Sequence, residues 1–186
     1  ILPARDAARM ASPSGVASWS VPKAEGDAMS FALPFTFTVH DRVAVVSYFF
    51  RWLDGNSSGS SGPFYCSRPE PFARRQTGPS GPEIVPGVAA TIWLKPYDLG
   101  VSQRLEISLP TDPETGEHIA RVRIARVSGN TASWRRTVKP FLTVLRKQFL
   151  NWRVATPADR IAMFEEARTM LAELPVSTEN REESHG

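Results

Sequence analysis

The sequence predicts an α+β fold in which an antiparallel sheet of about five strands carries two C-terminal helices packed on one face. Three observations support this prediction. Between residues 31 and 127, apolar residues alternate with polar ones or form short apolar runs, as in strands. Between residues 133 and 174, apolar residues recur with the period of a helix. Strand patterns come first and helical patterns last, an order typical of α+β proteins.

The first two strands are expected between residues 31 and 53. Within residues 31–39, Phe35, Phe37 and Val39 alternate with Thr36 and Thr38, the period-2 pattern of a half-buried strand. Residues 40–42 are polar and predict a turn. Residues 43–53 carry aromatic or branched side chains at nearly every position, which is typical of a strand buried on both faces. Together these segments predict a hairpin.

Residues 54–87 are predicted to form a flexible loop. Residues 55–62 contain only Gly, Ser and Asn, a low-complexity connector that resembles a synthetic linker. Residues 67–82 follow as a second loop, rich in Pro and Arg.

Three more strands are expected over residues 88–127. Residues 88–94 form a short apolar segment that ends before a proline. Residues 101–109 alternate without interruption, which places on one face Val101, Gln103, Leu105, Ile107 and Leu109. Residues 119–127 alternate in the same way after a turn rich in Pro and Gly, so these two strands should form a hairpin.

The length suits a single domain, which we place at residues 30–175. Residues 1–29 are rich in Ala, Ser, Pro and Gly and predict an extended N-terminal arm. Residues 176–186 are polar and charged and predict a disordered tail.

Residues 133–174 are predicted to form two helices, and Pro140 complicates the first one. Either a short turn over residues 133–138 precedes a helix that begins with Pro140, or one helix kinks at this proline. The first alternative fits better, because proline is tolerated in the first turn of a helix. Thr156, followed by Pro157 and Asp159, predicts the start of the second helix, which runs to Leu174.

Residues 133–153 are amphipathic in an unusual way. At 100° per residue, one sector gathers apolar and aromatic side chains: Trp134, Val138, Phe141, Leu142, Leu145, Phe149 and Trp152. In the neighbouring sector every charged residue is a cation: Arg135, Arg136, Lys139, Arg146, Lys147 and Arg153. This segment should therefore pack on the sheet with one side and present a cationic face with the other.

The charge of this region is almost entirely positive. Ten Lys or Arg and one Asp lie between His118 and Arg160, although the net charge of the chain is only +3. A solvated helix face usually mixes Glu with Lys, which stabilises the helix through pairs four residues apart. One interpretation is that the cationic face of the helix is only solvated. The other is that this face binds an anionic partner. The predicted contact residues are Arg121, Arg123, Arg135, Arg136, Lys139, Arg146, Lys147 and Arg153.

These features predict a non-enzymatic interaction domain, a soluble extramembrane part of a membrane-associated bacterial protein or complex. Its partner would be an anionic membrane surface or an acidic protein. Trp134 and Trp152, near the two ends of the segment, are expected at the membrane interface. A nucleic-acid-binding domain that uses the same cationic face is the alternative, although no motif for sequence-specific recognition occurs.

The predicted location is cytoplasmic, extending to the membrane surface. Cys66 is the single cysteine, so the chain has no intramolecular disulfide framework. No apolar run approaches the roughly 18–20 residues that a membrane-spanning helix needs. The first residues contain neither an initiator Met nor a signal peptide, so we expect a fragment or a processed chain.

Signals of catalysis are weak. Residues 55–59 match the G-x-S-x-G pattern, which makes a serine hydrolase that uses Ser57 a further alternative. That motif needs a helix directly after the serine, and a Gly/Ser string follows instead. The histidines lie far apart in the sequence: His40, His118 and His185. We therefore expect no metal, no cofactor and no small-molecule substrate.

Overall fold

The computed structural model describes residues 26–57, 64–94 and 100–178. Its helices and strands follow one another along the chain as β1 (Ala28–Phe37), α3 (Val39–Gly55), β2 (Phe64–Cys66), β3 (Glu70–Gly78), β4 (Gly81–Leu94), β5 (Ser102–Ser108), β6 (His118–Ser128), α4 (Thr131–Trp152), α5 (Pro157–Ala172) and β7 (Val176–Thr178).

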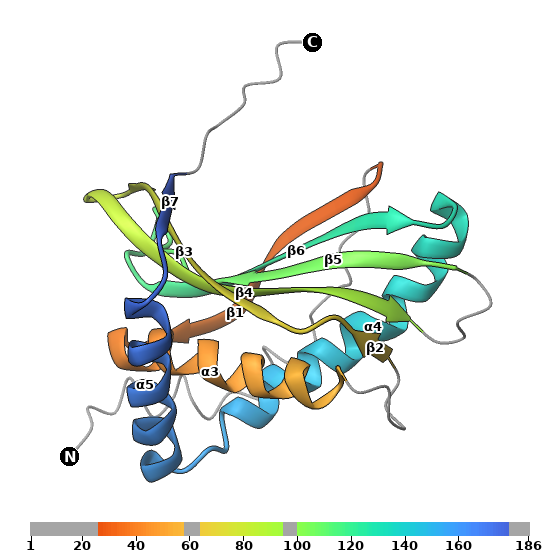
Figure 1. Ribbon diagram of the computed structural model, residues 1–186. Helices are drawn as coiled ribbons and strands as arrows, with labels where there is room; N and C mark the ends of the chain where they lie inside the picture. The colour runs from red at the N-terminus through yellow and green to blue at the C-terminus, as the bar shows by residue number, and fades with distance from the viewer. Residues whose placement is uncertain (1–25, 58–63, 95–99, 179–186) are drawn as a thin grey trace.

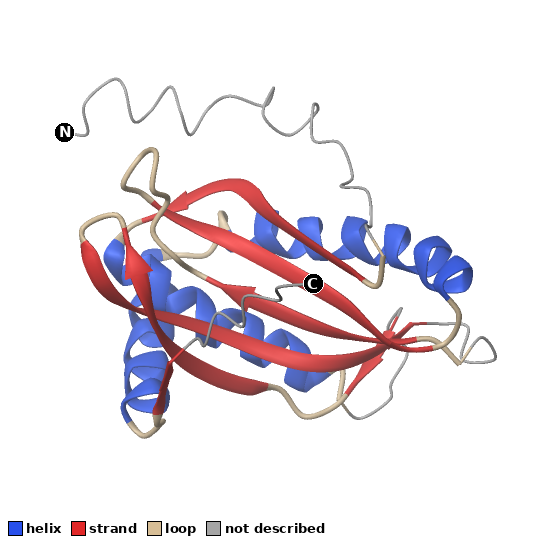
Figure 2. Ribbon diagram, turned by 90° about the horizontal axis from the view of Figure 1, so that it is seen from above, coloured by secondary structure: helices blue, strands red, loops and turns tan. Residues whose placement is uncertain are grey.

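The described strands form one seven-stranded sheet with the order β1-β6-β5-β4-β3-β7, and β2 also pairs with β4. All pairs are antiparallel except β3 with β7, which is parallel. The helices α3, α4 and α5 lie against one face of this sheet, and no helix of the described residues lies on the opposite face (Figures 1 and 2). The predicted α+β class is confirmed, but the sheet is larger and mixed, and a third helix joins the two C-terminal ones.

The predicted hairpin of residues 101–127 is present as β5 and β6. Leu105 pairs with Ile124 and Ile107 with Val122. The expected inward face of the first strand is buried along its whole length: Val101, Gln103, Leu105, Ile107 and Leu109. Strict alternation was sufficient here, because one face of each strand meets the core and the other meets solvent.

The predicted strand over residues 43–53 is wrong, since this segment lies in helix α3. Thr38 caps the helix, its Oγ1 accepting from the backbone N–H of Asp41 at 3.1 Å. The apolar run fits a buried strand and a buried helix equally well. A helix that faces a wide core buries residues that are adjacent in the sequence as well as residues three or four apart. Thr38 and Asp41, three residues apart, form the capping signature that distinguishes the helix from a strand.

The predicted flexible loop over residues 54–87 is also wrong in part, because β2, β3 and the first half of β4 lie within it. Prolines are tolerated in these strands because of where they lie. Pro71 is in β3, whose outer edge pairs with only three residues of β7. Pro82 and Pro86 precede Gly87, where the pairing of β4 with β5 begins.

Helix α4 is continuous through Pro140, so the favoured alternative, a separate turn followed by a new helix, is wrong. Pro140 lies on the exposed side of the helix, where water can hydrate the carbonyl that loses its hydrogen bond. Helix α5 begins as predicted, with Thr156 as its cap and Pro157 in its first turn.

The chain ends differ from the predicted arm and tail where they are described. Residues 28 and 29 belong to β1, and Val176–Thr178 form β7. The rest of the arm up to residue 25, the tail from residue 179, and residues 58–62 of the Gly/Ser connector lie outside the described residues.

Candidate binding face of helix α4

Helix α4 is anchored by one buried side. Asn130 caps its N-terminus, and the Asn130 side chain accepts from the backbone N–H of Ser133 at 2.8 Å. The buried residues follow the helical period: Ser133, Trp134, Val138, Phe141, Leu142, Leu145, Phe149 and Trp152. Phe141 and Phe149 reach Phe64 and Phe49, with ring centroids 5.4 and 4.3 Å apart. The opposite side of α4 is therefore held in a fixed direction toward solvent.

That opposite side is cationic. We use the term α4 cationic face for four exposed side chains: Arg135, Arg136, Lys139 and Lys147. Helix α4 contains no acidic residue. None of the four forms an ion pair with a carboxylate in the described part of the chain, and Arg136 Nη2 reaches only Ser133 Oγ, at 3.5 Å.

The carboxylate near the start of α4 is engaged elsewhere. Asp27 Oδ1 accepts from Arg126 Nε at 2.9 Å. This hydrogen bond and the charge of Arg126 lower the pKa of the Asp27 carboxyl, and Thr131 and Arg135 add smaller contributions, while partial burial opposes them. Arg135 is thus the smallest of these contributions to the Asp27 carboxyl and forms no ion pair with it.

The remaining predicted cations of this helix are partly used by the fold. Arg146 is half-buried, and Arg146 and Arg153 each take part in an intramolecular interaction. The Arg153 guanidinium also lies over the ring of Phe35, 5.6 Å from its centroid. These two residues can assist a partner but do not belong to the exposed centre of the face.

The structure does not bring Arg121 and Arg123 to this face. Val122 between them is completely buried in the core with the helices, while both arginines are exposed. Successive residues of a strand point to opposite faces, so these arginines lie on the side of the sheet away from α4. The sequence showed their alternation but not which side of the sheet the helices cover.

The prediction that Trp134 and Trp152 lie at an interface is wrong, because both are buried, with 0% and 3% exposure. Trp134 Nε1 donates to Gln103 Oε1 at 3.0 Å inside the core. Trp152 packs edge-on against Tyr48, with ring centroids 5.5 Å apart. Both residues lie in the apolar sector of the helix, and every residue of that sector is buried in the core.

Arg160, counted in the basic block, serves the fold. Its guanidinium forms an ion pair with Asp41 at 3.5 Å and donates to the carbonyls of Trp152 and Arg153 at 3.3 and 3.1 Å. It therefore connects the starts of α3 and α5 and satisfies two carbonyls at the end of α4.

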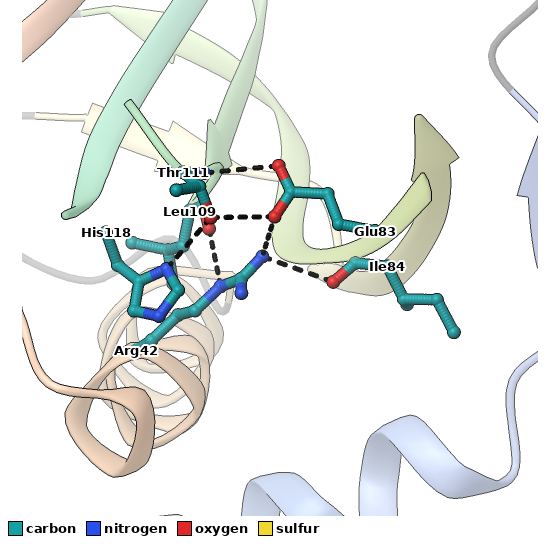
Figure 3. Close-up of polar contacts among 6 residues, drawn as sticks. All are labelled: Arg42, Glu83, Ile84, Leu109, Thr111 and His118. Atoms are coloured by element: carbon teal, nitrogen blue, oxygen red, sulfur yellow. Dashed lines mark hydrogen bonds and ion pairs between the residues drawn. The ribbon is translucent and has the colours of Figure 1, made fainter. Parts of the chain in front are cut away.

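A polar cluster that the sequence did not predict connects α3 to the sheet (Figure 3). Arg42 Nε donates to the Leu109 carbonyl at 2.6 Å, and Arg42 Nη2 lies 3.4 Å from Glu83 Oε2. Glu83 also accepts from Thr111, from the backbone N–H at 3.2 Å and from Oγ1 at 2.8 Å. Arg42 was expected in a turn and Glu83 in a loop, so their meeting was not foreseeable.

His118 completes this cluster, since its Nδ1 lies 3.2 Å from Thr111 Oγ1. Burial and the nearby positive charge of Arg42 lower the pKa of His118 below its usual value of 6.5, and Glu83 opposes them. The hydroxyl of Thr111 is committed to Glu83, so the arrangement holds three segments together rather than activating a nucleophile.

Neither Ser57, the nucleophile that the sequence suggested, nor the single cysteine, Cys66, is hydrogen-bonded to an activating base among the described residues. Ser57 Oγ donates to the Asp54 carbonyl at 2.7 Å, while Ser58 and Gly59 lie outside the described residues. Cys66 is buried and its Sγ donates to the Leu53 carbonyl at 3.0 Å. Burial, helped by Asp54, raises the pKa of the Cys66 thiol to about 11, so the reactive thiolate is scarce at neutral pH.

Within residues 26–57, 64–94 and 100–178, no three side chains of His, Cys, Asp or Glu gather in a way that could hold a metal ion. None of the helices described is both long and apolar enough to cross a membrane. No protein-family model matches the sequence, and neither the curated proteins nor the solved structures include a significant match to this chain.

Proposed function

We propose that this protein is a non-enzymatic interaction domain that docks on an anionic membrane surface through the α4 cationic face. One observation carries the proposal: Arg135, Arg136, Lys139 and Lys147 are exposed on one side of a rigidly anchored helix and have no ion-pair partner among the described residues. In this proposal the domain is the extramembrane part of a membrane-associated protein or complex.

The length and the charge of the face suit a flat anionic surface. Arg136 and Lys147 are separated by about 16 Å along the helix axis. Each Lys or Arg near an anionic bilayer contributes about 1 kcal/mol, so the face contributes about 4 kcal/mol at low salt. Because Trp134 and Trp152 are buried, the attachment is electrostatic and needs no insertion of aromatic side chains.

The proposal is tested by sedimentation with vesicles of phosphatidylcholine alone and with about 30% phosphatidylserine, over a salt series. The native chain should bind only the anionic vesicles and dissociate as the salt concentration rises. The variant R136S/K139S/K147S should lose most of this affinity.

The matched control is R68S/R121S/R123S, which removes three exposed cations outside α4. It should bind vesicles nearly as the native chain does. Equal losses in both variants would mean that net charge alone drives adsorption, and no vesicle binding at low salt would refute the proposal. In that case the partner would be an acidic protein or a nucleic acid that binds the native chain and not the variant R136S/K139S/K147S.

A further inference from the structure

The sheet face opposite the helices carries two neighbouring aromatic side chains. Phe64 and Cys66 are buried in the core on either side of Tyr65, so Tyr65 points to the opposite face. Ile92 is buried in the same way beside Trp93. Tyr65 and Trp93 form a register pair between β2 and β4, and their ring centroids are 5.3 Å apart with the planes tilted by 39°. Both residues are half-buried, so neither is fully enclosed by the protein.

The same face carries arginines. Arg104, beside Thr91, is engaged with Glu70 at 3.6 Å and Glu106 at 3.8 Å. Arg121 and Arg123 of β6 are exposed and form no ion pair with any described residue. The aromatic pair and these two arginines therefore share one sheet face that none of the described helices covers (Figure 1).

The sheet register sets the separation of the two features. In the sheet register, Arg123 of β6 lies opposite Glu106 of β5, and Glu106 lies opposite Ala89 of β4. Ala89 is four residues before Trp93 on β4, so both residues point to the same face of the sheet. With the usual strand spacing and rise, Arg123 is about 16 Å from Trp93, and Arg121 is farther along the same direction. A ligand that meets both features must be extended, anionic at one part and planar at another.

We propose that this sheet face binds single-stranded nucleic acid, with a base stacked on the Trp93–Tyr65 pair and phosphates on Arg121 and Arg123. Stacked bases supply planar faces and the backbone supplies regularly spaced charges, which matches the two features. A duplex hides the faces of its bases, so it can satisfy the arginines but not the aromatic pair. This site is separate from the α4 cationic face and does not depend on the proposed membrane docking.

The test is fluorescence anisotropy of a labelled oligothymidylate of about 12 nucleotides, at several salt concentrations, with the full chain and four variants. W93L keeps an apolar side chain without a ring and should weaken binding about 5- to 160-fold. R121S/R123S should reduce the slope of log affinity against log salt by about 1.4, the value for two phosphate contacts on a single strand. Binding should also quench the fluorescence of Trp93, a change that W93F removes.

The matched control is R135S/R136S, which removes two exposed arginines from α4 on the other side of the molecule. It should leave oligothymidylate binding nearly unchanged, and a duplex of equal length should bind more weakly than the single strand. The proposal is overturned if the oligothymidylate does not bind at low salt, if W93L binds it as tightly as the native chain, or if R135S/R136S lowers its affinity as much as R121S/R123S does. Circular dichroism of each variant shows whether a loss reflects misfolding, and W93F, which keeps an aromatic ring, should retain affinity that W93L loses.

Discussion

The substitution K139E should make the protein more stable while it weakens anion binding. Lys139 is exposed and lies four residues after Arg135 and three after Arg136, so it is repelled by both. Each such pair on a helix changes stability by about 0.2–0.5 kcal/mol, and a glutamate would turn two repulsions into two attractions. Because the cation here precedes the anion, the less favourable order, we expect a gain of about 0.5–1 kcal/mol in the free energy of unfolding.

The same substitution replaces one cation of the α4 cationic face by an anion. With about 1 kcal/mol for each charge near an anionic bilayer, affinity for anionic vesicles at low salt should fall about 30-fold. Urea denaturation measures the stability, and vesicle sedimentation measures the affinity. A variant that is both more stable and weaker in binding excludes misfolding as the cause of the loss.

The matched control is K147E, because residues 143, 144, 150 and 151 around Lys147 are uncharged. It should lose the same affinity as K139E without the gain in stability. If K139E is no more stable than the native chain, the repulsion argued from the helix is absent. If it is more stable but binds vesicles unchanged, Lys139 does not face the partner and the proposed docking face is wrong.

The buried and half-buried polar groups predict three more responses. The unfolded chain binds the proton of His118 at higher pH than the native protein does, so the free energy of unfolding should fall as pH drops below about 6.5, and H118N should flatten that part of a urea-denaturation profile. Cys66, with its raised pKa of about 11, should react with a thiol reagent at pH 8 only as fast as the native structure opens, whereas in urea it should react at once. W134F leaves Gln103 Oε1 buried without its donor and should cost about 1–3 kcal/mol in urea denaturation, while adding Q103L should recover part of the loss.

The elements that the sequence predicted correctly are those whose signals are local. The hairpin of β5 and β6 follows from strict alternation, and the start of α5 follows from Thr156 and Pro157. Helix α3 was missed because branched residues such as Val45 and Val46 suggested a strand, while tertiary packing buries them equally well in a helix. Strands β2 and β3 were missed because their stability comes from pairing with β4, a contact distant in the sequence.

The sequence predicted the positive charge of the candidate site, but it did not predict which cations lie on the same side of the molecule. The cations of α4 are exposed where the helical period places them, because local geometry alone fixes which residues share a helix face. Whether Arg123 joins them depends on which sheet face the helices cover, and periodicity along one strand does not contain that information. The same limit applies to Tyr65 and Trp93, which meet only through the pairing of β2 with β4.

Helix α5 shows what a solvated helix of this protein looks like when it serves the fold alone. Its exposed side mixes signs: Arg168 pairs with Glu165 at 2.7 Å within the helix, and Glu166 pairs with Arg51 of α3. Helix α4 also exposes one side to solvent and has a better anchored inner side, with eight buried residues against one in α5, so its folding does not require an outer face of one sign. Repulsion among its cations lowers stability, and such a cost is typical of surfaces that serve binding rather than folding. The difference between the mixed charges of α5 and the purely cationic face of α4 therefore supports an anionic partner for α4.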